Sequence, residues 1–147
     1  MALLLHYTGQ DYISRGLLNT ELTPGSTSAI VVGCKTGKGF AFDRTPNSAL
    51  YVNNIGILMP IKFTVSCWFR VNDIANRKPI FSNGQITNTG FQLDVYDDYV
   101  RVVGYNTDNV YVMVKSSVGS IAANTWYYVT AGVDGSRFFL YLNSSLS

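Results

Sequence analysis

The segment with the clearest structural signal reads Phe63-Thr64-Val65-Ser66-Cys67-Trp68-Phe69-Arg70-Val71. Apolar side chains, beginning with Phe63, occupy every second position, and polar side chains or Trp68 stand between them. Because successive side chains of a strand point to opposite faces, this alternation predicts a β-strand with one face turned to a core.

Similar alternation recurs along the chain, whereas helical periodicity is nearly absent. Turn signals such as Asp97-Asp98 and Asp134-Gly135 separate the alternating runs. We predict further strands at residues 3–7, 29–33, 39–43, 49–52, 91–96, 99–103, 110–115, 126–133 and 137–142. Many short strands joined by turns predict an all-β fold, an antiparallel sandwich of two sheets. The side chains that we expect to find buried are Phe63, Val65, Phe69, Leu93, Val129 and Leu140.

The composition is that of a folded domain with no obvious charged partner. The length of 147 residues suits one domain. With 47% hydrophobic and 14% charged residues, the chain is too apolar to be disordered. Its 11 Lys and Arg residues are scattered, so no clustered basic face predicts nucleic-acid binding. No apolar run approaches the ~20 residues of a membrane helix, so membrane insertion is not expected.

Cys34 and Cys67 are the only cysteines, and both lie in apolar strand segments. This setting favours free thiols that behave as small hydrophobic side chains, although a disulfide between them stays open as an alternative. Neither cysteine has a CxxC partner, so a zinc site is not predicted.

Three blocks of this sequence together resemble one family. They are the segment Phe63–Val71, the segment Asn124–Gly135 with Trp126-Tyr127-Tyr128-Val129 in it, and the segment Phe138–Ser144 with Leu140-Tyr141-Leu142-Asn143 in it. In this order they resemble the laminin-G-like / concanavalin-A-like jelly roll, and residues 37–43 and 50–53 extend the resemblance toward the N-terminus. The resemblance implies a jelly-roll sandwich that occurs in adhesins, in modules of carbohydrate-active enzymes and in phage tail fibres.

The resemblance also implies further strands after the Leu-Tyr-x-Asn hairpin, the last of which pairs beside the first strand. We therefore expect residues 1–147 to form a single laminin-G-like β-sandwich that lacks the family's last one or two strands. Residues 3–7 are expected to border the gap. A strand from another subunit would close it, so the chain is expected to be a homo-oligomer or part of a longer polypeptide.

Catalysis is not expected, because the residues for it are missing. Glycoside hydrolysis normally needs two carboxylates that flank the scissile bond. Glu21 is the only glutamate, and Asp97 and Asp98 are neighbours in a turn that cannot flank a sugar. His6 is the only histidine, and no nucleophile elbow accompanies it. No cofactor is predicted, although the loop oxygen donors Asp43, Asp108 and Asn109 leave calcium open, as in some laminin-G-like domains.

A binding surface is the more informative prediction. If the apolar residues of each strand face the core, an aromatic platform with planar polar groups lies opposite, and such a platform suits a sugar. Its candidate ligand-binding residues are Trp68, Arg70, Gln92, Asp94, Tyr96 and Arg101. The same residues could instead cover an outer face or pack against another subunit. If this face binds a glycan, Trp68→Ala and Arg101→Ala should both weaken binding, Trp68→Ala more strongly because stacking area is lost. Arg101→Ala is expected to leave the melting temperature nearly unchanged.

These observations predict a non-enzymatic recognition or structural module. The interpretation that we favour is a phage or virion component, such as a tail-fibre or host-attachment part, that assembles with other virion subunits and binds a glycan. It would be located in the virion, since residues 1–6 carry no pattern of a signal peptide. Two alternatives are a carbohydrate-binding module in a longer bacterial cell-surface protein and, less favoured, a glycan-cleaving enzyme.

Overall fold

The computed structural model describes residues 23–24, 30–35, 38–42, 50–51, 62–83, 90–105, 108–135 and 137–146. The chain divides into two compact units, Met1–Gly56 and Ile57–Ser147. Every described pair of strands is antiparallel.

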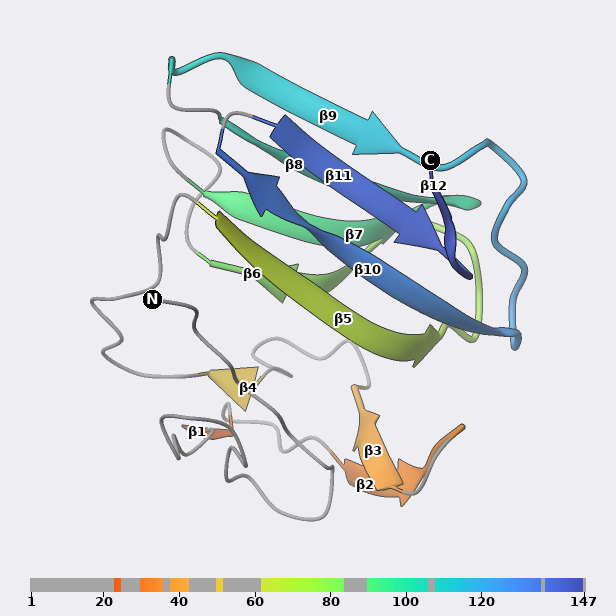
Figure 1. The fold of residues 1–147 in the computed structure, drawn as a ribbon. Helices are drawn as coiled ribbons and strands as arrows, with labels where there is room; N and C mark the ends of the chain where they lie inside the picture. Colours follow the sequence, from red (N-terminus) through yellow and green to blue (C-terminus); the bar gives the residue numbers. More distant parts are fainter. Residues whose placement is uncertain are drawn as a thin grey trace. The chain divides into compact units, whose positions relative to one another are not determined.

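The first unit contains two small antiparallel pairs (Figure 1). Strand β1 (Thr23–Pro24) pairs with β4 (Leu50–Tyr51), and β2 (Ile30–Gly33) pairs with β3 (Lys38–Ala41). Strands are therefore confirmed in the predicted ranges 29–33, 39–43 and 49–52, while residues 29, 43, 49 and 52 lie outside the described part of the chain. The strand predicted at 3–7 lies outside the described residues.

The second unit is a sandwich of two four-stranded sheets (Figure 1). Sheet A has the order β12-β11-β10-β5, and sheet B has the order β6-β7-β8-β9. No helix occurs in the described part of the chain. The strands are β5 (Lys62–Arg70), β6 (Arg77–Ser82), β7 (Phe91–Tyr96), β8 (Tyr99–Tyr105), β9 (Tyr111–Lys115), β10 (Trp126–Asp134), β11 (Arg137–Leu142) and β12 (Ser145–Leu146). The predicted all-β sandwich is confirmed.

The core lies between the inner faces of the two sheets. Leu93 on β7 and Val102 on β8 meet Val129 on β10 there, and none of the three exposes any surface. Four of the expected core side chains are buried, namely Phe69, Leu93, Val129 and Leu140. Phe63 and Val65 point inward as expected but are only half-buried. They lie on β5, which is the edge of sheet A among the strands that the structure describes, so fewer neighbours cover them.

One end of the core is a cluster of phenylalanine rings around Phe91. The Phe91 ring centroid lies 4.7 Å from that of Phe63 and 5.9 Å from that of Phe138, both of which belong to sheet A. Phe81, on the neighbouring strand β6, lies at 6.1 Å. Edge-to-face ring pairs of this kind add stabilisation beyond the burial of their area, so Phe91 joins the two sheets at this end.

Three strands were not predicted, namely β1 of the first unit and β6 and β12 of the second. The sequence of β6, Arg77-Lys78-Pro79-Ile80-Phe81-Ser82, does not alternate, and its register shifts between Pro79 and Phe81. A proline and a bulge are typical of an edge strand, which is where β6 lies. Strand β12 has two residues and returns along β11 after a tight turn at Asn143 and Ser144. Both turn residues have positive φ, 50° and 69°, as a two-residue hairpin turn of this hand requires.

Gly132 is the point of closest approach between β10 and its neighbours. A Cβ atom at this residue would lie 2.1 Å from the carbonyl oxygen of Phe63 on β5 and 2.8 Å from the ring of Phe139 on β11. The ring of Phe139 therefore occupies the space that a side chain would need on the outer face.

We expect Gly132→Ala to lower the free energy of unfolding by about 1–3 kcal/mol, because the added methyl group must displace backbone as well as a ring. Chemical denaturation monitored by tryptophan fluorescence measures the change. The matched control is Gly33→Ala, where nothing lies within 4 Å of the new methyl group and the change should stay within about 0.5 kcal/mol. Equal stability of Gly132→Ala and the parent protein would contradict this account of the close approach.

Cys67 is a free thiol on the inner face of β5. Burial raises its pKa from the ordinary value of 9.0 to about 11. Since the thiolate is the reactive form, this side chain should be inert at neutral pH.

In a Cys34→Ser variant, alkylation of Cys67 at pH 8 should be about a hundredfold slower in the folded protein than in denaturant, because a pKa raised by this much lowers the thiolate fraction by that factor. Mass spectrometry of iodoacetamide-treated samples measures both rates. The folded pKa lies above the unfolded one, so the stabilisation linked to the neutral thiol is complete below pH 9 and is lost as the pH rises toward 11. Similar rates in both states would show that the thiol is accessible.

Candidate functional site

The six predicted ligand-binding residues lie on two different surfaces. Trp68 and Arg70 are on the outer face of sheet A. Gln92, Asp94 and Tyr96 are on β7 and Arg101 is on β8, on the outer face of sheet B. The expectation that all six share one face is wrong, because the core separates the two sets. Alternation distinguishes inward from outward positions, but it does not say in which sheet a strand lies.

The outer face of sheet A is rich in aromatic side chains. The strand register places Trp68 opposite Tyr128 and Arg70 opposite Trp126. Phe139 and Tyr141 follow along β11 on the same face. We call this surface the aromatic face, and it consists of Trp68, Trp126, Tyr128, Phe139 and Tyr141.

Two rings of the aromatic face are open to solvent, and the other three are half-buried. Trp68 is 40% exposed and Tyr141 is 38% exposed. The Trp68 and Tyr128 rings have centroids 5.3 Å apart and planes inclined at 56°. The backbone beneath Tyr128 is held by Asn143, whose side-chain oxygen accepts a hydrogen bond from the Tyr128 N–H at 3.0 Å. The rings therefore stand on a backbone that the adjacent hairpin fixes.

Polar groups stand beside these rings. The Arg70 guanidinium lies 5.4 Å from the centroid of the Trp126 ring. The hydroxyls of Ser66 and Thr130 are hydrogen bonded to each other at 3.0 Å. At the far end of the face, an exposed ion pair joins Lys62 and Asp134 at 2.7 Å and holds the Asp134 pKa below its usual range.

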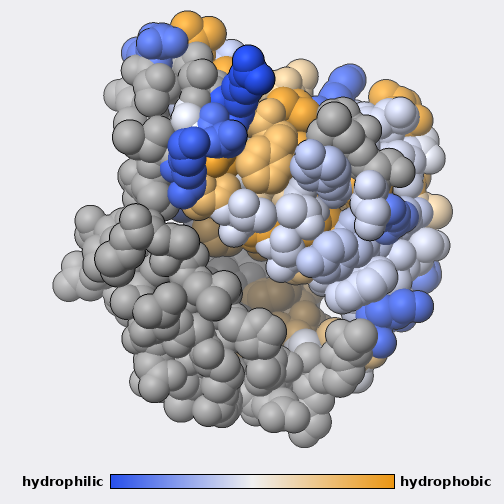
Figure 2. Space-filling model, in the orientation of Figure 1, coloured by the Kyte–Doolittle hydropathy of each residue, from blue (hydrophilic) through white to orange (hydrophobic). Residues whose placement is uncertain are grey.

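Figure 2 views the molecule with the strands of sheet A toward the reader. Pale, weakly hydrophilic side chains cover much of this sheet, and an orange hydrophobic patch reaches the surface near β9 and β11. Weakly polar aromatic and hydroxyl side chains have this pale colour. The surface is thus neither strongly charged nor purely apolar.

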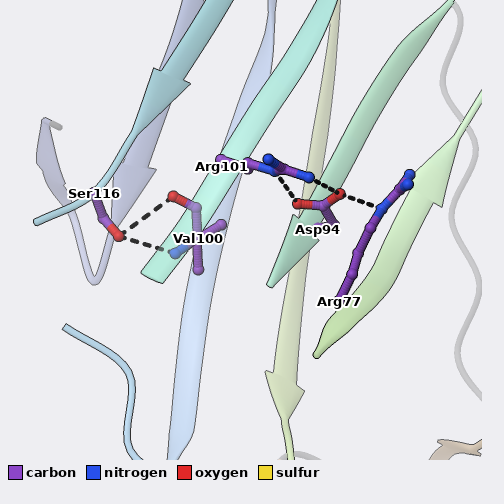
Figure 3. Close-up of polar contacts among 5 residues, drawn as sticks. All are labelled: Arg77, Asp94, Val100, Arg101 and Ser116. Carbon is purple, nitrogen blue, oxygen red and sulfur yellow. Dashed lines mark hydrogen bonds and ion pairs between the residues drawn. The ribbon is translucent and has the colours of Figure 1, made fainter. Parts of the chain in front are cut away.

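The outer face of sheet B is organised around one buried carboxylate, that of Asp94 (Figure 3). Arg77 on β6 donates to one carboxylate oxygen at 2.7 Å, and Arg101 on β8 donates to the other at 2.8 Å. Asp94 is fully buried although it points away from the core. Two charge-assisted hydrogen bonds from opposite sides compensate the loss of water around this charge.

Arg101 is held from two directions. Its guanidinium carbon lies 4.0 Å from the centroid of the Tyr96 ring, in addition to the bonds with Asp94. Burial by itself would lower the pKa of Arg101, but the hydrogen bond and the charge of Asp94 raise it above its ordinary value. Next to this pair, the Lys115 ammonium lies 4.9 Å from the centroid of the Tyr99 ring.

This geometry changes the roles of the predicted residues. Asp94 exposes no surface and Gln92 exposes only 5%, so neither is accessible to a ligand as the face stands. The expectation that Arg101→Ala would leave the melting temperature nearly unchanged conflicts with this arrangement, because Arg101 compensates a buried charge. Tyr96 is 37% exposed and is the accessible one of the four predicted ligand-binding residues on sheet B.

Arg101→Ala should lower the free energy of unfolding by about 2–4 kcal/mol, because it removes one of two partners of a buried carboxylate. Thermal unfolding measured by calorimetry tests this. The control is Arg137→Ala, at an exposed position on β11, where a change within about 0.5 kcal/mol is expected. An Arg101→Ala protein as stable as the control would show that Arg77 alone suffices for Asp94.

The remaining acidic residues singled out in the sequence lie in turns or outside the described residues. Asp97 and Asp98 form the turn between β7 and β8, as predicted, and Asp97 has a φ of 52°. Within the described ranges, no group of three or more His, Cys, Asp or Glu side chains could hold a metal ion. Asp43, His6 and Glu21 lie outside those ranges. In the described part of the chain there is also no helix of the length and apolarity needed to cross a membrane.

Trp126, Tyr128 and Tyr141 were not among the predicted site residues. The alternation of β10 assigned its Tyr127 and Val129 to the core, and it thereby implied that Trp126 and Tyr128 point outward. The outward positions of β10 predict Trp126 and Tyr128 on this face, and those of β11 predict Tyr141.

Residues 43–147 match the family model of the concanavalin A-like lectin/glucanases superfamily. The chain belongs to this superfamily. No curated protein matches it by sequence.

Solved structures with a similar fold are binding domains of clostridial toxins. The binding domain of Paraclostridial Mosquitocidal Protein 1 superposes with a TM-score of 0.73 at 18% identity, over 97% of this chain and 38% of that one. The botulinum neurotoxin serotype G binding domain superposes with a TM-score of 0.75 at 16% identity, over 97% of this chain and 37% of that one. The receptor binding domain of botulinum neurotoxin D superposes with a TM-score of 0.70 at 18% identity, over 97% of this chain and 38% of that one. This chain thus spans well under half the length of these domains, and the likeness is one of fold.

Proposed function

We propose that this domain is a non-enzymatic recognition module whose aromatic face binds a glycan. The observation that carries the proposal is the ring pair formed by the exposed Trp68 and the half-buried Tyr128 on a strand-borne surface. Sugar rings have apolar C–H faces that pack on aromatic rings, and Trp68 presents a large ring to solvent.

The polar neighbours of the rings supply the second requirement of a sugar site. Arg70 can donate several hydrogen bonds in a fixed fork, and the Ser66 and Thr130 hydroxyls can both donate and accept. These groups lie on β5 and β10, which pair along nine residues of each strand. A surface built on paired strands is ordered before the ligand arrives, so binding loses little conformational entropy.

The wider setting is part of the same proposal. A host-attachment role is supported by the similar structures, which are named as binding and receptor-binding domains. A place in a phage or virion, with other virion subunits as partners, stays a prediction from the sequence. A carbohydrate-binding module in a longer bacterial cell-surface protein is the alternative.

A glycan-cleaving activity is the second candidate, because the superfamily includes glucanases. Such an enzyme needs two carboxylates on opposite sides of an accessible bond. On the outer face of sheet B, Asp94 is buried and bound by two arginines, and Asp97 and Asp98 are adjacent in a turn. The arrangement of these acids favours recognition over hydrolysis.

A glycan array followed by titration calorimetry on the best ligand tests the proposal. Trp68→Ala and Tyr128→Ala should each weaken binding by roughly tenfold or more, because stacking area is lost. Tyr96→Ala removes an aromatic ring of similar exposure from sheet B and is the matched control, which should bind like the parent protein.

The same samples, assayed for reducing ends, should show no hydrolysis above background. Binding that survives both changes on the aromatic face, or that is lost in the Tyr96 control, would reject this face as the site. Turnover of the bound glycan would replace recognition with catalysis.

A further inference from the structure

The two edges of sheet B differ in how they are protected. Strand β6 forms one edge and contains Pro79, a register shift and two basic residues. One of these, Lys78, forms an ion pair with Asp73 at 2.8 Å. Proline, bulges and charges are the devices by which proteins prevent an edge strand from pairing with another chain.

Strand β9 forms the other edge and has none of these devices except a terminal lysine. It reads Tyr111-Val112-Met113-Val114-Lys115, and it has no neighbour beyond β8 among the described strands. Tyr111 is 50% exposed and Met113 is 47% exposed. An apolar, regular and exposed edge strand is a surface that favours strand addition.

The hydrogen-bond pattern shows which backbone groups of β9 face outward. The N–H of Ser116 donates to the carbonyl oxygen of Val100 at 2.9 Å, so Ser116 and Val100 form a hydrogen-bonded pair. In an antiparallel ladder such pairs alternate with pairs that do not bond each other. Val114 and Val112 therefore bond to β8, and the N–H and C=O groups of Tyr111, Met113 and Lys115 point away from it.

We propose that β9 pairs with β9 of a second copy of this chain, antiparallel and about a two-fold axis at Met113. In this register Met113 meets Met113 of the second copy, and Tyr111 meets Lys115 of the second copy. All three outward-facing residues then form hydrogen-bonded pairs. The result is a continuous eight-stranded sheet across two copies of sheet B.

The side chains are complementary in this register. Tyr111 and Lys115 project from the outer face, so each Tyr111 ring lies within reach of the Lys115 of the partner strand, whose ammonium already contacts the Tyr99 ring of its own chain. On the inner face, Val112 of one copy meets Val114 of the other, which extends the apolar row. No like charges face each other. The second copy is thus the occupant that this edge fits best.

The interface is one strand wide, so we expect a dissociation constant in the micromolar range or weaker. Sedimentation velocity over a wide concentration range should show a monomer–dimer equilibrium in the parent protein. Met113→Lys places two like charges on the two-fold axis and should weaken dimerisation on the order of a hundredfold or more. Val118→Lys adds the same charge to an exposed loop residue, and it should leave the equilibrium unchanged.

A backbone variant separates edge pairing from simple loss of apolar contact. Met113→Pro removes an N–H that points away from β8. The monomer should still fold, because an edge strand tolerates proline at a position whose N–H faces solvent, whereas the dimer should be lost. Thermal unfolding checks that both Met113 variants remain folded. Should proline disturb the monomer, Met113→Lys still decides the question.

Cross-linking tests the register itself. In a Cys34→Ser background, Met113→Cys should form a disulfide-linked dimer under mild oxidation, because hydrogen-bonded antiparallel partners have Cα atoms about 5.5 Å apart. Tyr111→Cys should not, since its own counterpart lies several residues away along the partner strand. A parent protein that stays monomeric up to its solubility limit, or a dimer unaffected by both Met113 changes, would overturn the proposal. Preferential cross-linking at Tyr111 would overturn the register.

Discussion

Burial of alternating apolar side chains between two sheets is the constraint on which the rest of this structure depends. Leu93, Val102 and Val129 lose all contact with solvent in the same layer. A shift of any of their strands by one residue would turn these side chains outward and polar ones inward. The cost of that exchange sets the register of β7, β8 and β10. It thereby also sets which residues appear on the two outer faces and at the edge formed by β9.

The sequence was sufficient where a strand is buried on one face only. The inward positions of β5, β10 and β11 are apolar or aromatic throughout, and the predicted limits of these strands are within one residue of those found. The same reasoning could not find β6, because Pro79 and the adjacent bulge interrupt both the alternation and the ladder. An edge strand is stabilised by its single neighbour more than by its own pattern, so its position follows from β7.

The surface was harder to predict than the core. Alternation identified Trp68 and Asp94 as outward-pointing, which is correct, but it could not show that the core separates them. The burial of Asp94 was equally out of reach, because one of its two partners, Arg77, lies on the strand that was not predicted. From the sequence alone, an outward-pointing carboxylate on a central strand is expected to be exposed to solvent. Here it is the centre of a network that spans three strands.

The separation of the two outer faces has a consequence for how such a domain can change over evolutionary time. The packed layer between them is ~10 Å thick in sandwiches of this kind, and residues that far apart with no shared partner contribute almost independently to stability. Substitutions on the aromatic face can therefore accumulate without disturbing the Asp94 network, and the reverse also holds. One face is free to follow a changing ligand while the other keeps its ion pairs, so a single scaffold can acquire new specificities by small steps.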